Sequence, residues 1–158
     1  MYNFFIAMLA VIASIFSCGK GTKSDSKVLS YEYSHHGTVA QPLVQFKVER
    51  LDDDSCLVTY YNHYKELSCD EYGNYKLDKS KQPIELLDSI SMIVKEHKMR
   101  KYKKDYKPIL DVLDGDSWSL HIQFEDSTSM SSHGYCAGPG DDGMTIIVRM
   151  LRNRIEGL

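Results

Sequence analysis

The segment 118–125 alternates more regularly between apolar and polar residues than any other part of the chain. Its residues are, in order, Trp118, Ser119, Leu120, His121, Ile122, Gln123, Phe124 and Glu125. Successive side chains of a β-strand point to opposite faces of the sheet, so the pattern predicts a strand with one buried face and one face in water. Such a sheet requires a second layer on its apolar face, which limits the chain to a few layered architectures.

Other segments show a similar β pattern. Strands are expected at residues 28–34, 43–50 and 56–61, with a shorter one at 75–78. After segment 118–125 the chain should return through residues 129–135, so that the two segments form an antiparallel hairpin. Asp126, Ser127 and Thr128 would then form a three-residue loop.

Two segments change to helical spacing. Apolar residues recur at helical intervals from Leu86 to Val94, which predicts a helix over residues 82–99 with Pro83 in its first turn. Asp141 or Asp142 is expected to cap a last helix, whose apolar stripe comprises Met144, Ile147, Val148, Leu151 and Ile155.

Each amphipathic helix needs an apolar surface to cover. The patterns therefore predict an α+β fold, an antiparallel sheet of about five or six strands with two helices packed on one face. The expected order along the chain is four strands, a helix, two strands and a helix.

The N-terminal segment indicates a compartment. Residues 4–16 are apolar apart from one serine, are too short to span a bilayer as a helix, and precede Cys18. This is typical of a bacterial lipoprotein, and Gly19 after the cysteine favours the outer membrane of the cell envelope. The expected divisions are a signal peptide (1–17), the lipidated Cys18 with a flexible linker (18–27) and a single α+β domain (28–158). The alternative is a buried N-terminal helix.

The charge balance excludes one class of partner. The chain has 19 basic and 22 acidic residues and a formal net charge of -3, which provides no general attraction to nucleic acid. A local basic run comprises Lys95, Lys98, Arg100, Lys101, Lys103, Lys104 and Lys107. This run is interpreted as a solvated helix end, with contact to an anionic glycolipid or a partner as the alternative.

Lipidation of Cys18 leaves three cysteines. If Asn62 and His63 form a two-residue hairpin loop, counting outward places Cys56 opposite Cys69 in a pair without backbone hydrogen bonds, where side chains approach closely. The sequence thus allows a disulfide between Cys56 and Cys69. Two buried free thiols are the alternative.

One polar sheet face is a candidate binding surface. The three-residue loop would place His121 opposite His133, and Gln123, Glu125, Ser129 and Ser131 would share their face. A glycan or a metal ion could bind there, although a solvated sheet surface accounts for the same residues, and no metal site and no cofactor are predicted.

Cys136 raises the question of catalysis. It lies close to His133 in sequence, which allows a Cys/His nucleophile, but no orienting Asn or Asp is identifiable. The sequence contains no phosphate-binding glycine loop, zinc-type cysteine pair, zincin helix or nucleophile elbow. No catalytic residue is therefore assigned.

Residues 102–108, 113–120, 131–135 and Pro139 together resemble a family of uncharacterised small envelope lipoproteins of Bacteroides-like bacteria. The resemblance extends from the first helix to the C-terminus. It implies an envelope lipoprotein and supplies no activity. This chain departs from the family pattern at Cys136, where Asn is usual, and at Ser127, where Gly commonly completes the turn.

These features favour a non-enzymatic binding or interaction module held on the membrane by its lipid anchor, with an unknown protein or glycan as partner. Two alternatives remain. One is a small hydrolase that uses Cys136 with His121 or His133, and the other is an immunity or inhibitor protein that acts against a secreted enzyme.

Overall fold

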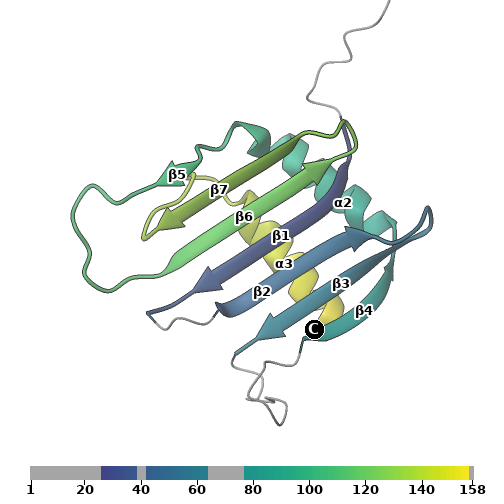
Figure 1. The fold of residues 1–158 in the computed structure, drawn as a ribbon, viewed down its shortest axis with the longest axis horizontal. Coiled ribbons are helices and arrows are strands. Elements are labelled where there is room, and N and C mark those ends of the chain that lie inside the picture. Colours follow the sequence, from purple (N-terminus) through teal and green to yellow (C-terminus); the bar gives the residue numbers. More distant parts are fainter. Residues whose placement is uncertain (1–25, 39–41, 64–76, 157–158) are drawn as a thin grey trace, which may run out of the picture.

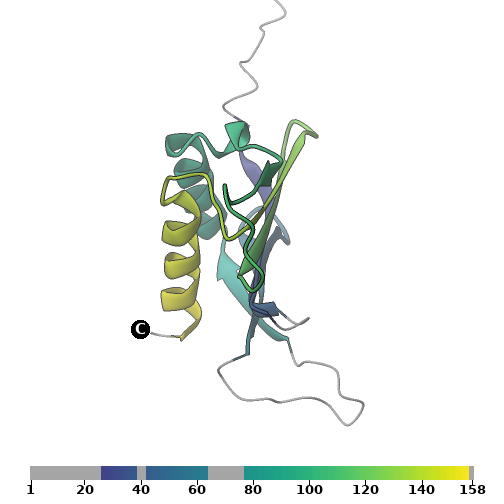
Figure 2. The ribbon, with the colours of Figure 1, turned by 90° about the vertical axis from the view of Figure 1, so that its left-hand side faces the viewer.

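The computed structural model describes residues 26–38, 42–63 and 77–156. They form one sheet of seven strands, and both helices lie on the same face of it (Figures 1 and 2). The strands are β1 (Val28–His36), β2 (Pro42–Arg50), β3 (Ser55–Asn62), β4 (Asp78–Pro83), β5 (Asp105–Tyr106), β6 (Ser117–Phe124) and β7 (Ser129–Tyr135). The helices are α2 (Glu85–Glu96), the short 3-10 helix η1 (Met99–Lys101) and α3 (Gly143–Glu156). The predicted α+β architecture is confirmed.

The strand order across the sheet is β4-β3-β2-β1-β6-β7-β5. All neighbours are antiparallel except β5, which runs parallel to β7. The prediction missed β5 because a two-residue strand is too short to show a period. A tertiary contact helps to position β5, because the ring of Tyr106 packs on that of Trp118 with the ring centroids 5.8 Å apart.

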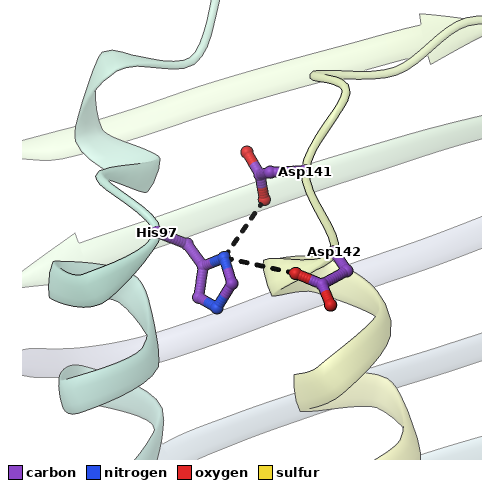
Figure 3. A group of neighbouring side chains, drawn as sticks. All are labelled: His97, Asp141 and Asp142. Carbon is purple, nitrogen blue, oxygen red and sulfur yellow. Dashed lines mark ion pairs between the residues drawn. The ribbon is translucent and has the colours of Figure 1, made fainter.

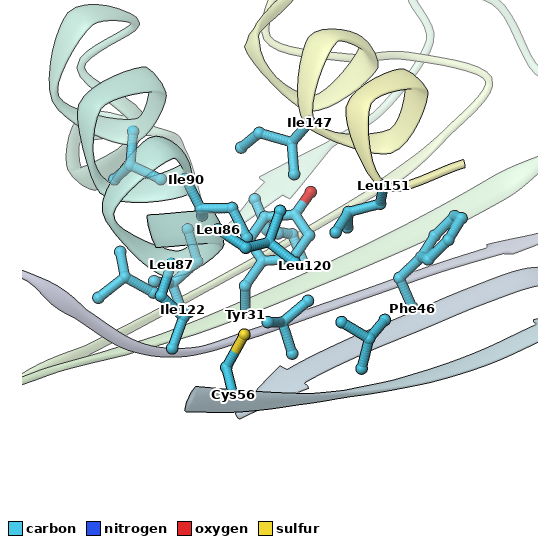
Figure 4. Packing of buried hydrophobic residues seen from close by; sticks show 14 of the residues in the cluster. Tyr31, Phe46, Cys56, Leu86, Leu87, Ile90, Leu120, Ile122, Ile147 and Leu151 are labelled. Carbon is cyan, nitrogen blue, oxygen red and sulfur yellow. The ribbon is translucent and has the colours of Figure 1, made fainter. Parts of the chain in front are cut away.

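The core lies between the sheet and the two helices. Figure 4 shows Tyr31 and Phe46 of the sheet facing Ile90 of α2 and Ile147 and Leu151 of α3, and all five are 0% exposed. Burying a side chain of this kind contributes about 1.5–3 kcal/mol. The alternation that predicted β6 has its expected result, because Leu120, Ile122 and Phe124 belong to this core. The predicted apolar stripe of α3 also faces the core. Ile147 and Leu151 are core residues, and Met144, Val148 and Ile155 pack against the core.

Helix α2 is shorter than predicted. It begins at Glu85 and ends at Glu96, whereas Pro83 is the last residue of edge strand β4, where it faces Ser55 of β3. Proline is acceptable both in a first helical turn and on a strand at the edge of a sheet, so Pro83 alone does not show whether its segment is helix or strand. The helix ends where Lys98 takes a left-handed backbone conformation, with φ of 52°.

The register proposed for Cys56 is wrong. Its neighbours across the ladder are Arg50 of β2 and Gln82 of β4, so both ladder positions beside Cys56 are filled by residues other than Cys69. That observation removes the geometric argument for a disulfide with Cys69. Cys69 and Cys18 both lie outside the described residues. Cys56 is buried and forms no disulfide with any other described residue.

Two of the non-glycine residues with positive φ lie just before and just after β7. Ser127 has φ of 61° in the β6–β7 turn, and Cys136 has φ of 48° after β7. Glycine adopts this conformation without steric cost, and asparagine tolerates it better than most residues. Gly at position 127 or Asn at position 136 would therefore suit the backbone better than the residues present.

Candidate functional site

The sheet face opposite the helices carries polar side chains and is covered by no helix of the described residues (Figure 2). Short contacts link neighbouring strands across it. The Ser34 and Ser119 hydroxyl oxygens lie 2.7 Å apart, His121 Nδ1 lies 2.8 Å from Ser131 Oγ, and His133 Nε2 lies 3.2 Å from Asp105 Oδ1. The result is a solvent-facing surface of hydroxyl, imidazole and carboxylate groups that runs from β1 to β5.

Five of the six predicted residues share this face, but in a different register. His121 lies opposite Ser131, Gln123 opposite Ser129 and His133 opposite Ser119, so His121 and His133 do not face each other. The turn consists of residues 125–127 rather than 126–128, because the Phe124 N–H donates to the Thr128 carbonyl. A shift of two residues preserves the face, since side chains alternate with a period of two.

Glu125 does not lie on the strand. It occupies the turn, and its carboxylate forms an ion pair of 2.9 Å with Arg50 of β2. The two histidines are bonded to different neighbours, His121 to Ser131 and His133 to Asp105. The described structure thus does not join the predicted residues into one ligand-binding cluster.

A group that sequence reasoning missed lies where α2 ends and α3 begins. His97 Nδ1 is 3.6 Å from Asp141 Oδ1 and 3.5 Å from Asp142 Oδ1 (Figure 3). The potential ligand atoms of these three residues lie within 4.8 Å of one another, so they could hold a metal ion. Nothing in the separate sequence positions of His97 and Asp141 indicated this contact.

Existing hydrogen bonds give this group a structural role. Asp141 Oδ1 already accepts hydrogen bonds from the Tyr102 hydroxyl at 2.5 Å and from the Gly143 N–H at 2.9 Å, so of the two predicted candidates Asp141 caps α3 through its side chain. Burial, together with the hydrogen bond to Asp141, raises the pKa of Tyr102 well above its usual range. A side chain at Gly143 would place its Cβ 2.8 Å from His97 Cβ, so the two helix ends pack closely. We assign the group to capping α3 and joining it to α2.

Cys136 is exposed, and its backbone N–H donates to the Asp116 carbonyl. The imidazoles of His121 and His133 bond Ser131 and Asp105, and among the described residues neither bonds the Cys136 thiol. A cysteine nucleophile needs a base within hydrogen-bond reach, and this arrangement supplies none.

Among the described residues, the most exposed large apolar side chains lie in the loop of residues 107–116, between β5 and β6. Ile109, Leu110 and Leu113 are 102%, 79% and 99% exposed. The Tyr135 hydroxyl donates to the Val112 carbonyl at 3.1 Å, which fastens the loop to the end of β7. The sequence signal for this loop is a set of apolar residues after Pro108 that matches the period of neither a strand nor a helix.

This loop lies at the far end of the domain from Val28, where β1 begins. In the ladder between β1 and β6, Val28 pairs with Phe124 and His36 pairs with Ser117. The chain enters the domain at Val28 and the loop ends at Ser117, so the two lie at opposite ends of adjacent strands (Figure 1). A strand of nine residues spans about 30 Å.

No protein-family model matches the chain, and no curated protein matches it. Among the described residues, neither helix has the length and apolar character needed to cross a membrane.

Proposed function

We propose that the protein is a lipid-anchored binding module of the bacterial cell envelope, attached through Cys18, and that it recognises a partner protein through the loop of residues 107–116. The exposure of Ile109, Leu110 and Leu113 carries the proposal. Soluble domains rarely expose several large apolar side chains together, and such patches mark interaction sites.

The loop is suited to this role energetically. Burying three large apolar side chains in a partner contributes about 1.5–3 kcal/mol each. The bond from Tyr135 to Val112 holds the loop before a partner arrives, and an ordered loop loses less entropy on binding. A few buried apolar anchors can therefore supply most of the affinity.

The position of the loop also supports the proposal. With the chain attached through Cys18, the linker leads to Val28, and the loop lies at the opposite end of the strands. The domain would then hold the loop away from the bilayer, where a partner in the surrounding compartment can reach it. A secreted enzyme is one such partner, and in that case the protein acts as an inhibitor or immunity protein.

The uncovered polar sheet face favours a second candidate, a glycan-binding role. Hydroxyl and imidazole groups such as those of Ser34, Ser119, His121 and Ser131 are suitable donors and acceptors for sugar hydroxyls. This function would use the sheet face and would not require the apolar loop.

Pull-down of the native lipidated protein from its own envelope tests both roles. We compare the wild type with the loop variant Ile109→Ser Leu110→Ser Leu113→Ser, and we expect capture of one specific protein to fall at least about tenfold. The matched control is Leu51→Ser Leu77→Ser Met92→Ser, which removes three other exposed apolar side chains. Equal loss in both variants would contradict the proposal, as would loss only in His121→Ala His133→Ala.

The anchor is tested separately by metabolic labelling with a fatty-acid analogue. Cys18→Ser should lose the label and leave the membrane fraction, whereas Cys136→Ser should keep both. Persistent labelling of Cys18→Ser would exclude the proposed attachment.

A further inference from the structure

A cavity of about 260 Å³ opens between the C-terminal end of α2, η1 and the end of β6. Its basic side chains are Lys95, Lys98, Arg100 and Lys101, and its apolar wall is formed by Val94 and Phe124. The cavity therefore combines a cationic rim with an apolar surface.

The local fold explains why the cations gather there. Helix α2 ends as Lys98 turns into a left-handed conformation, and the buried Met99 anchors η1 against the core. Three cationic residues, Lys98, Arg100 and Lys101, thus surround one buried position. A non-glycine residue held in this conformation is uncommon, and such residues are enriched at functional sites.

Arg100 is held in a fixed position. Its guanidinium lies 3.4 Å from the centroid of the Phe124 ring, and it donates to Thr128 Oγ1 at 3.0 Å. The nearest carboxylate is that of Asp126, at 3.4 Å. Among the described residues no carboxylate pairs with Lys98 or Lys101, so the rim keeps an excess of positive charge.

The cavity also lies beside the linker. Ser26, the first described residue, contributes to its lining and is eight residues after Cys18. Eight extended residues reach at most about 29 Å, so a lipidated Cys18 would keep the cavity within that distance of the membrane surface. This step rests on the lipid anchor of the proposed function.

We infer that this cavity binds the phosphate of an anionic phospholipid headgroup. Lys98 and Lys101 supply the charge that pairs with the phosphate oxygens. Binding would hold this end of the domain on the bilayer and direct the loop of residues 107–116 away from it.

The test uses residues 18–158 with Cys18→Ser, so that no acyl chain contributes to binding. This segment includes every residue of the buried core, all of which lie between 28 and 155, and thermal unfolding confirms that each variant is folded. Sedimentation with phosphatidylcholine vesicles is compared with sedimentation when phosphatidylglycerol is added, at low and high salt. Inorganic phosphate alone serves as the probe for a free-phosphate site.

Binding to the phosphatidylglycerol vesicles is expected, with no binding to phosphatidylcholine alone. Lys98→Gln Lys101→Gln should lower the affinity at least about tenfold, because each lysine near an anionic surface contributes severalfold. The control Lys79→Gln Lys81→Gln makes the same charge change on β4 and should bind like the wild type. Equal loss in both variants, binding to both vesicle types, or binding of inorganic phosphate without vesicles would each overturn the inference. Acyl labelling of Cys18 reports on the anchor independently, so failure of one proposal is distinguishable from failure of the other.

Discussion

The guanidinium of Arg100 stacks on the ring of Phe124 and joins η1 to the end of β6, residues that are 24 positions apart in sequence. Arg100→Lys should destabilise the domain by about 1 kcal/mol, because a lysine loses the planar stacking and the forked hydrogen bonds. Urea unfolding measures the change. Arg149→Lys on the exposed side of α3 is the control, and an equal effect there would show that the Arg100 contact contributes nothing specific.

The hydroxyl of Tyr102 connects the chain after η1 to the cap of α3. Tyr102→Phe removes its hydrogen bond to the charged Asp141 and should cost about 1.5–3 kcal/mol in unfolding free energy. Thermal or urea unfolding tests this value.

Tyr31→Phe is the matched control for that substitution. The Tyr31 hydroxyl is fully buried and has no hydrogen-bond partner among the described residues, so its removal should leave stability unchanged or raise it. If both variants lost the same stability, the Tyr102 bond would have no special role.

Ser127 and Cys136 have positive φ, and replacing them should stabilise the fold. Ser127→Gly and Cys136→Asn are each expected to raise the unfolding free energy by about 0.5–1 kcal/mol, since left-handed backbone is costly for most residues. Ser129→Gly in strand β7 should have the opposite sign. A loss of stability in Ser127→Gly would contradict the turn geometry.

The turn carboxylate of Asp126 should make stability depend on acid pH. Its hydrogen bond from Thr128, together with Arg100, holds the pKa of Asp126 below its ordinary value of 3.8. A carboxyl whose folded pKa is lowered stabilises the fold above the unfolded pKa, and this contribution is lost as pH falls through the folded value. Asp126→Asn should thus flatten the stability profile below about pH 4. An unchanged acid limb in this variant would contradict the assignment.

The two described cysteines should differ in reactivity. Burial raises the pKa of the Cys56 thiol, whereas Cys136 is exposed, so an alkylating reagent should modify Cys136 much faster in the folded protein. Peptide mass mapping after timed alkylation measures both rates. His133→Ala should leave the Cys136 rate unchanged, and a sharp fall would instead support the hydrolase alternative.

Local patterns in the sequence determined strands β1, β2, β3, β6 and β7 and the two α-helices. Alternation from Trp118 to Phe124 and the helical stripe from Ile147 to Leu151 depend only on which side chains must be buried, and both lie in the core as expected. Alternation along β6 and β7 also placed His121 and His133 on the polar face, because successive residues of a strand point to opposite faces of the sheet.

Only the tertiary structure decided which segments meet. The observed β6–β7 register differs from the predicted one by two residues. The sequence pattern could not distinguish them, because both registers bury the same side chains and differ only in the turn. The ladder neighbours of Cys56 and the contact of His97 with Asp141 join distant segments, and no local period encodes such pairings. The exposure of Ile109 and the basic cavity beside Phe124 were likewise decided there, since packing alone determines which apolar residues remain in water and which cations converge.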